Sequence, residues 1–262
     1  MQPVDFSIVI PAYNNLSLLQ QALSSVKRQK DVSMQIIIVD DSNQNNEIEQ
    51  YVCSMDDPDI LYKHNSPSLG AVSNWNSGLR LATGEYVVLI HHDEEFVGCN
   101  YLKTVKAAFD NADVVVSNIM ICNERGHTHG LYAPWFKKMT LRFPPSLFCI
   151  NAIGPCAVCA FKRNVLTEFD ESIHWFVDVE WYYRLINGRR ISYNSSTCVV
   201  SHHGHQEQIT NTIDITSEAK KDATILYRKY NENLIVKSAI WIQIHVLHNA
   251  ILHKALKFIS GR

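Results

Sequence analysis

Acidic side chains directly follow apolar runs at two places in this chain, and both arrangements suit chemistry. The segment 91–94 reads His-His-Asp-Glu after a run that ends at Ile90, and the segment 177–180 reads Val-Asp-Val-Glu. The first segment could hold a divalent cation with a diphosphate, because hard cations prefer oxygen ligands. The second could take a proton from an alcohol, which is the task of a general base. The two segments together predict a site that binds a metal diphosphate and activates a hydroxyl.

Short apolar runs alternate with helix-compatible stretches ahead of and between these segments. Strands are predicted for these runs: 6–10, 36–39, 60–63 and 86–90. Helices are predicted after Asn15, where Leu16, Leu19, Leu23 and Val26 recur at helical spacing, and over 72–81. This alternation predicts an α/β fold with a mainly parallel central sheet flanked by helices. Pro11 is expected to end the first strand.

Polar residues follow several of the predicted strands, and ligands of such sheets bind outside the carboxyl ends of the strands. We therefore expect these residues to converge on one edge: Tyr13, Asn14, Asp40, Asp41, His91, His92 and Asp93. The first strand is not followed by GxGxxG, which argues against a nicotinamide or flavin Rossmann domain. The chain also contains no GxxxxGK[ST] phosphate loop.

Composition bounds the class of protein. The 262 residues are 46% hydrophobic and 19% charged, which is ordinary for a globular chain. The net charge of −2 argues against a nucleic-acid partner. Seven cysteines at scattered positions, including a lone Cys156-x-x-Cys159, favour reduced buried thiols over disulfides or zinc. The N-terminus does not resemble a signal peptide, so we expect a cytoplasmic protein.

The segment 216–262 is expected to form a basic, helical C-terminal tail. From Lys220 to Arg262 there are eight Lys or Arg against two acidic residues. An amphipathic helix is predicted over 234–259, and its charged and His residues interrupt the apolar run too often for a bilayer span. Two interpretations remain open: the helix packs on the body or in a homodimer, or it lies peripherally on the inner face of the cytoplasmic membrane.

Four motifs occur in an order that resembles one known family. They are the segments 7–14 (SIVIPAYN), 38–42 (IVDDS) and 82–90 (ATGEYVVLI), and the acidic cluster that follows the last of these. This arrangement resembles a family 2 glycosyltransferase of the GT-A fold, which transfers sugars from nucleotide diphosphates, and the resemblance covers about residues 5–205. It implies a GT-A domain over 1–215, with a nucleotide-sugar-binding half at 1–110 and an acceptor and catalytic half at 111–215.

The resemblance assigns the nucleotide of the donor to these residues: Pro11, Ala12, Tyr13, Asp40, Asp41, Asn76 and His91. A Tyr ring offers a stacking face, and a carboxylate can accept from the imino group of uracil or thymine. The alternative for Asp40 and Asp41 is that they cap the following helix. Trp75 stands where many uridine-specific members carry Arg, so both UDP and dTDP donors stay open.

The resemblance places the metal at Asp93, with His91 where the family commonly has another Asp. One carboxylate with diphosphate oxygens and waters suffices for Mn²⁺ or Mg²⁺, and a ligating imidazole would favour manganese. His91 could instead hydrogen-bond the ribose, and Glu94 is expected to be a neighbour rather than a ligand. His203, in preference to His202, is expected to complete the metal sphere or to neutralise the leaving phosphate.

The second acidic segment resembles the family stretch in which an acidic pair opens a helix that carries Arg one turn later. This assigns the catalytic base to Asp178, with Val177 where Glu is commoner. A helix N-terminus would keep Asp178 ionised, and the alternative is an ordinary acidic residue at a helix start. Glu180 is the less favoured candidate base.

The sequence therefore predicts a metal-dependent, inverting glycosyltransferase that acts on a growing glycan or lipid-linked glycan of a surface polysaccharide such as lipopolysaccharide or capsule. One alternative is a sugar-nucleotide-binding subunit without turnover, motivated by His91 and Val177. A nucleotidyltransferase is disfavoured because no Gly-rich basic loop follows the first strand.

Overall fold

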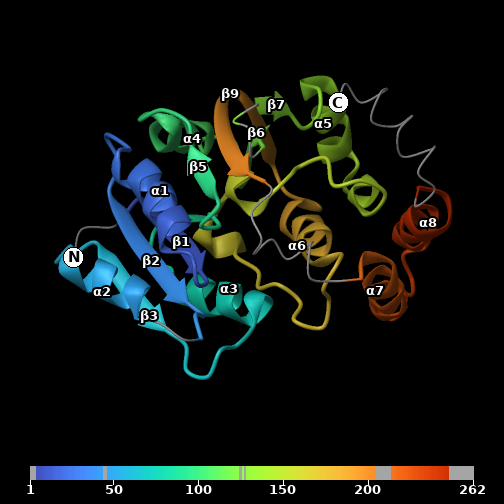
Figure 1. Ribbon diagram of the computed structural model, residues 1–262. Helices are drawn as coiled ribbons and strands as arrows, with labels where there is room; N and C mark the ends of the chain where they lie inside the picture. The colour runs from blue at the N-terminus through green and yellow to red at the C-terminus, as the bar shows by residue number, and fades with distance from the viewer. Residues whose placement is uncertain (1–3, 44–45, 124–125, 127, 204–213, 248–262) are drawn as a thin grey trace.

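A mixed sheet forms the centre of the computed structural model, which describes residues 4–247 except 44–45, 124–125, 127 and 204–213 (Figure 1). Its strand order is β3-β2-β1-β4-β8-β6-β9-β5, and β7 pairs with β6. The strands are β1 (Phe6–Ala12), β2 (Met34–Asp40), β3 (Ile60–His64), β4 (Tyr86–Leu89), β5 (Glu94–Phe96), β6 (Val114–Cys122), β7 (Thr128–Gly130), β8 (Cys159–Lys162) and β9 (Ile191–His202).

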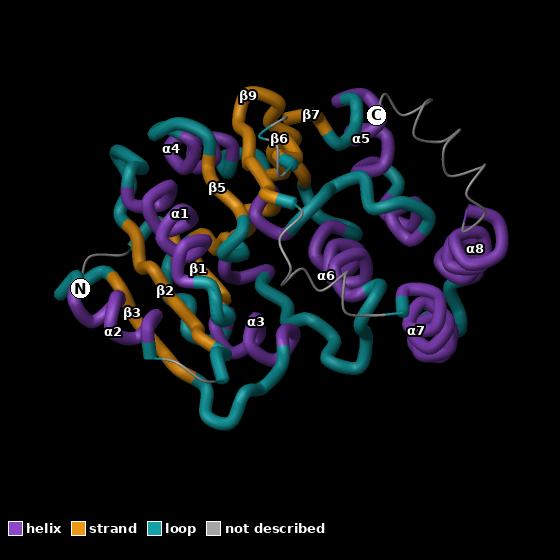
Figure 2. Tube along the Cα trace, viewed as in Figure 1, coloured by secondary structure: helices purple, strands orange, loops and turns teal. Residues whose placement is uncertain are grey.

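Helices flank this sheet and extend beyond one end of it. They are α1 (Leu16–Lys27), α2 (Glu47–Ser54), α3 (Ala71–Leu79), α4 (Tyr101–Ala108), α5 (Pro134–Arg142), α6 (Val177–Ile186), α7 (Ile215–Lys229) and α8 (Leu234–Ile242). Among the described residues, the 3-10 helices η1 (Pro144–Phe148), η2 (Cys156–Val158) and η3 (Arg163–Val165) lie in the connections. Figure 2 shows α6, α7 and α8 together at the end of the molecule away from β3.

The parallel strands β3, β2, β1 and β4 form the first half of the sheet, as the apolar runs predicted. All residues of β1 and β4 and the last five residues of β2 are buried, and α1 and α3 pack against β1. Strand β3, at the edge of the sheet, is partly exposed. Helix α3 lies very close to the sheet: a Cβ at Gly78 would come within 2.4 Å of the Val9 side chain. The α/β class, with most paired residues in parallel strands, is confirmed.

The prediction that Pro11 ends the first strand was wrong. Pro11 and Ala12 continue β1 and pair with Val39 and Asp40. The Ile90 N–H donates to the Val9 carbonyl, so the backbone groups of Val9 point toward β4. Those of Pro11, two residues later, point to the same side, where β4 has already ended at Leu89. Proline is tolerated there because no ladder hydrogen bond is lost.

The second half of the sheet contains antiparallel strands that the sequence did not predict. Strand β8 joins β4 to β6, and β5 pairs with the C-terminal end of β9. Strands of three or four residues carry too little periodicity to be recognised, and their pairing depends on partners far along the chain. The pairing with β9 places the residues after β4 beside the end of β9.

The C-terminal segment begins with two helices that pack on the body of the same chain. Helix α8 buries Val236, Ala239 and Ile240, and its backbone accepts a hydrogen bond from Cys149. The helix predicted over 234–259 is α-helical to Ile242 in its described part and continues as a π-helical turn over Gln243–Leu247. The remainder, 248–262, lies outside the described residues. Across the described ranges, none of the helices is both long and apolar enough to cross a membrane.

Candidate active site

The loops that follow β1 and β2 are tied to each other at the carboxyl edge of the sheet. Asn14 has a φ of 51°, and its N–H donates to Ser42 Oγ at 2.8 Å. Tyr13 is exposed, and its hydroxyl accepts a hydrogen bond from Asn43. Its ring is therefore accessible, as stacking on a base requires. The donor contacts of Pro11, Ala12 and Tyr13 stay predictions.

Asp41 is buried, and four groups donate hydrogen bonds to its carboxylate. They are Asn65 Nδ2 (3.1 Å), Ser68 Oγ (2.6 Å), the Leu69 N–H (2.8 Å) and the Gly70 N–H (2.9 Å). These contacts fix the segment that leads into α3, where Gly70 has a φ of 84°. A donor base that used Asp41 would compete with this set, so base recognition by Asp41 stays a prediction.

Asp40 is also buried and also has protein donors on both oxygens. Ser42 donates to Oδ1 through its N–H and its hydroxyl, and Tyr62 donates its hydroxyl to Oδ2 at 2.8 Å. Desolvation, together with this bond, raises the pKa of Tyr62. The contacts with Ser42 form a turn after β2 rather than a cap on α2, whose N-cap residue is Asn46.

Asn76 and Trp75 connect α3 to the segment that precedes α6. Asn76 Nδ2 donates to the Phe169 carbonyl and to Glu171 Oε1, and its Oδ1 accepts from the Phe169 N–H. Trp75 contacts the Phe169 ring and the His91 ring edge-on, with centroids 5.1 Å and 4.9 Å apart. Asn76 thus has a clear structural role, and its donor contact stays a prediction. Trp75 forms one wall beside His91.

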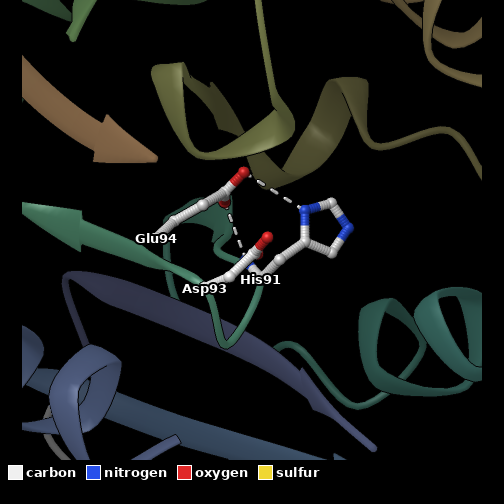
Figure 3. Close-up of side chains that lie close together, drawn as sticks. All are labelled: His91, Asp93 and Glu94. Carbon is white, nitrogen blue, oxygen red and sulfur yellow. Dashed lines mark hydrogen bonds and ion pairs between the residues drawn. The ribbon is translucent and has the colours of Figure 1, made fainter. Parts of the chain in front are cut away.

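His91, Asp93 and Glu94 converge in the turn between β4 and β5 (Figure 3). Each offers one ligand atom, and these atoms all lie within 4.8 Å of one another. Glu94 Oε2 accepts the His91 N–H at 2.8 Å, and Glu94 Oε1 lies 3.3 Å from His91 Nδ1. His91 Nε2 is buried and has no hydrogen-bond partner among the described residues. Figure 3 shows Nε2 on the side of the ring away from Glu94.

The electrostatics of this cluster include Asp178. Burial lowers the pKa of His91, but the carboxylates of Glu94, Asp93 and Asp178 raise it by a larger amount. The resulting pKa is about 9. Burial raises the pKa of Glu94, and the facing imidazolium opposes this shift. Without a bound cation these carboxylates favour the protonated form of His91, which must lose its Nε2 proton before the ring can ligate a metal, and Asp178 is close enough to contribute to this shift. The structure brings together three of the predicted residues: His91, Asp93 and Asp178.

Asp178 lies in the first turn of α6, as predicted. Burial raises its pKa, while His91 and a hydrogen bond from Cys156 Sγ at 3.7 Å lower it. The expectation that the helix N-terminus keeps Asp178 ionised stays a prediction, and desolvation acts against it by raising the pKa. A raised pKa makes this carboxylate a better proton acceptor.

Helix α6 is held in place by the following helix α7, which the sequence did not indicate. The buried Asp222 accepts hydrogen bonds from the N–H groups of His174, Trp175 and Phe176, the last at 2.9 Å. Phe176 is the N-cap residue of α6, and His174 and Trp175 immediately precede it, so Asp222 binds the backbone that leads into the helix. Asp222 thus fixes the turn from which Asp178 projects. No local motif marks Asp222, which lies 46 residues after Phe176.

Glu180 has a different environment from Asp178. It is fully buried, and it receives Arg184 at 2.7 Å, Lys229 at 2.9 Å and the Tyr230 hydroxyl at 2.7 Å. Although burial raises its pKa, these donors bring it below the usual value. Glu180 is therefore a structural carboxylate that joins α6 to α7.

The two histidines at the end of β9 have separate surroundings. The His202 N–H donates to the Asp93 carbonyl, and its ring lies 2.7 Å from Glu95. The His203 N–H donates to the Cys122 carbonyl, and its side chain is exposed. In the described part of the chain, His203 is not grouped with the cluster of His91, Asp93 and Glu94. Its metal role stays a prediction, and the following segment 204–213 lies outside the described residues.

The cluster fits a divalent cation by its chemistry. Two carboxylates and an imidazole with an unpartnered buried nitrogen form a donor set that suits Mn²⁺, and the carboxylates alone suit Mg²⁺. Asp93 and His91 would be the residues to hold it, because Glu94 already accepts the His91 N–H. Such an ion offsets the negative charge of a diphosphate.

Comparison with known proteins shows which chains and folds this protein resembles. Over 91 residues the chain is 38% identical to WcaA of Escherichia coli K12, which is named for colanic acid biosynthesis; this covers 34% of the chain and 33% of WcaA. The fold matches S. aureus TarS in complex with UDP-GlcNAc, with a TM-score of 0.71 and 16% identity over 98% of this chain and 79% of that one. It also matches the mannosyltransferase PcManGT of Pyrobaculum calidifontis, in complex with GDP-Man and Mn²⁺, with a TM-score of 0.67 and 18% identity over 100% of this chain and 75% of that one.

The chain spans between about a third and two thirds of the length of the first curated relatives it matches. The structural neighbours share the GT-A fold of glycosyltransferases. The family model "Glycosyl transferase family 2" matches residues 7–169, which is more than half of the chain. The protein therefore belongs to glycosyl transferase family 2.

Proposed function

We propose that this protein is a metal-dependent, inverting glycosyltransferase that moves a sugar from a UDP- or dTDP-type donor to a hydroxyl of a growing glycan. One observation carries the proposal. A cluster of His91, Asp93 and Glu94, whose donor atoms could hold a cation, lies within electrostatic range of Asp178, whose pKa is raised by burial. A diphosphate site and a proton acceptor side by side are what this transfer requires.

The reaction assigned to Asp178 is a single displacement. Asp178 accepts the proton of the acceptor hydroxyl as its oxygen forms a bond to the anomeric carbon, and the bond from that carbon to the diphosphate breaks. The nucleotide diphosphate leaves with the electron pair. The thiol of Cys156 donates to Asp178 Oδ1 and so orients the carboxylate. The buried Trp75 ring lies against the His91 ring and shields one side of the site from water.

The donor is assigned to the loops that follow β1 and β2. The exposed ring of Tyr13 is available for stacking on the base, and the Asp40 and Asp41 contacts hold the loops in place. A bound divalent cation supplies charge neutralisation for the diphosphate, and His91 and Asp93 are the residues assigned to hold it. Relatives of known fold contain UDP-GlcNAc or GDP-Man with Mn²⁺, which supports a nucleotide sugar and a metal.

The acceptor is proposed to be a glycan or lipid-linked glycan of a bacterial surface polysaccharide. The similarity to WcaA supports this context. An enzyme at the inner face of the cytoplasmic membrane could reach such an acceptor, and the basic C-terminal tail would favour that location.

Donor binding is the experiment that tests the proposal. A panel of nucleotide diphosphate sugars is titrated by calorimetry with and without Mn²⁺, into the wild type and into Asp93→Ala. We expect one donor to bind in the presence of metal and Asp93→Ala to abolish this. Asp110→Ala, which changes an exposed acidic residue, is the matched control.

Turnover of the bound donor then distinguishes the proposal from its alternative. Release of nucleotide diphosphate with a glycan acceptor, lost in Asp178→Asn, supports a transferase. Metal-dependent donor binding without turnover on any acceptor would instead support the non-catalytic subunit. Failure of every donor to bind would contradict both.

A further inference from the structure

Helix α5 has two faces of different composition. Its inner face packs on the body through these buried residues: Phe136, Lys137, Thr140 and Leu141. Lys137 Nζ donates to the carbonyls of Ser117 and Ile153, and burial lowers its pKa to about 8. These contacts fix the rotation of α5 about its axis, so the identity of the outward residues is determined.

The outward residues of α5 form a continuous stripe at helical spacing. We define the α5 stripe by these exposed residues: Trp135, Lys138, Met139, Arg142 and Phe143. Trp135, Met139 and Phe143 are 54%, 51% and 51% exposed, although each is a large apolar side chain. A solvent-facing helix surface is normally polar. Aromatic and apolar residues that alternate with Lys and Arg are typical of helices that lie at a membrane interface.

A cavity of about 540 Å³ lies beside the α5 stripe and has basic walls. Lys138, Arg142 and Arg189 line it, and none of its described lining residues is acidic. Arg189 is held by hydrogen bonds to the carbonyls of Arg184 and Leu185, so its charge is fixed in the wall. Tyr193 closes another side of the cavity and lies 5.8 Å from Lys138 Nζ. This combination suits a phosphate group.

The cavity is not part of the candidate active site. It includes Ile191 at the first residue of β9, whereas His202 at the last residue of β9 contacts Asp93. A strand of twelve residues spans up to roughly 35 Å at about 3.3 Å per residue. A bound phosphate in this cavity would therefore be remote from the diphosphate of a donor.

We propose that the α5 stripe and its cavity dock this protein on an anionic phospholipid bilayer. The apolar side chains of the stripe enter the interfacial region, and the cavity receives the phosphate of a lipid headgroup. Charge complementarity selects this partner. The chain as a whole has a net charge of −2, so attraction to an anionic surface must come from a local patch such as this one. The proposed docking does not depend on transferase activity.

Vesicle binding tests the docking surface. The full-length protein is sedimented with phosphatidylglycerol-containing vesicles and with pure phosphatidylcholine vesicles at physiological salt. Lys138→Gln combined with Arg142→Gln should weaken binding to the anionic vesicles about 25-fold, since each basic residue near such a surface contributes a factor of about five. Trp135→Ser should weaken it about fivefold, because half of a large apolar side chain no longer enters the interface.

Matched variants elsewhere on the surface control for general effects. Lys30→Gln combined with Lys63→Gln removes two exposed charges on the other half of the molecule, and Leu61→Ala removes an exposed apolar side chain. Both should bind vesicles as the wild type does. Circular dichroism and melting temperature confirm that every variant is folded, so that loss of binding reports on the surface.

Three results would overturn the proposal. The first is equal binding of the wild type and the α5 variants to anionic vesicles. The second is equal binding to neutral and anionic vesicles. The third is binding of inorganic diphosphate to the cavity, lost in Lys138→Gln with Arg142→Gln, without any vesicle binding; the cavity would then serve a soluble anion. None of these readouts requires turnover, so they stand apart from a failure of the proposed transferase activity.

Discussion

Two groups of acidic residues lie at the same edge of the sheet, and they differ in how their charges are satisfied. Asp41 accepts four hydrogen bonds from protein groups. Asp40, the preceding residue, belongs to the same group. Glu94 and Asp178 have few donors, and burial raises the pKa of each. The hydrogen bonds of Asp40 and Asp41 offset the free-energy cost of their desolvation. For Glu94 and Asp178 that cost is offset by the charge of a protonated His91 and by the binding of a ligand.

This difference indicates which group carries structure and which carries chemistry. A carboxylate with a full set of donors fixes the backbone around it and gains little from a ligand. A buried carboxylate with a raised pKa and a buried imidazole nitrogen without a partner can still form strong interactions. Substitutions in the two groups should therefore have opposite effects on stability and on turnover.

The largest effect is expected for Asp178→Asn. It should lower kcat about 10³-fold, because a positioned general base contributes between about 10² and 10⁴. The melting temperature should stay the same or rise, since a neutral amide replaces a buried charge. Steady-state kinetics and thermal unfolding measure both quantities on one sample.

Glu180→Gln is the control for Asp178→Asn, because it changes a carboxylate on the same helix. Glu180 forms ion pairs with Arg184 and Lys229, so we expect lower stability and a smaller change in kcat. Wild-type turnover in Asp178→Asn would contradict the assignment of the base.

Asp41→Ala should have the largest effect on stability. It leaves four donors in and beside the segment 65–70 without their acceptor, which costs about 4 kcal/mol at about 1 kcal/mol for each hydrogen bond. Urea unfolding of the purified variant gives the free energy directly. Asp59→Ala, at an exposed position, should change it by less than about 0.5 kcal/mol. Equal stabilities of the two variants would show that the Asp41 contacts contribute little.

The pH dependence of stability should report on His91. Its folded-state pKa of about 9 lies above the ordinary value of 6.5, so its stabilising contribution is complete below pH 6.5 and is lost as the pH rises through 9. The free energy of unfolding, measured in chelator, should fall by up to about 3 kcal/mol across this window. The raised pKa values of Glu94 and Asp178 act in the same direction.

Glu94→Gln removes the principal cause of the raised His91 pKa, so most of this slope should disappear. Glu95→Gln is the matched control, because Glu95 faces His202 rather than His91. A slope that is unchanged in Glu94→Gln would mean that another group titrates.

The smallest effect is expected for the thiol beside Asp178. Cys156→Ala removes a hydrogen bond that lowers the Asp178 pKa, so the acidic limb of the kcat profile should move to higher pH by about half a unit. Cys156→Ser offers a stronger donor and should move it the other way. Movement in the same direction for both variants would indicate a packing effect instead.

Much of the parallel half of the fold could be predicted from the sequence. Its strands are apolar runs that end in polar residues, and the strand 34–40 followed by Asp41 is such a case. The strands 94–96 and 159–162 could not be predicted, because three or four residues do not establish a period and their partners are far away in sequence.

For the candidate site, residue positions were predictable but environments were not. His91, Asp93 and Asp178 were expected from their motifs, and the structure brings them together. The hydrogen bonds of Asp41 come from a loop more than twenty residues away, and the pKa of Asp178 depends on burial by other elements. Neither is encoded in local sequence. Asp222 has no motif at all, because its function arises only when α7 meets α6.

The Asp222 contact has a consequence for the order in which the molecule is completed during synthesis. The N–H groups that it accepts from are made 46 to 48 residues earlier, which is several seconds at about 5–20 residues per second. A nascent chain can therefore form the parallel half of the sheet while the start of α6 still lacks its acceptor. Asp178 gains its fixed position only when most of the polypeptide has been made, so an unfinished chain should lack the proposed proton acceptor and be inactive.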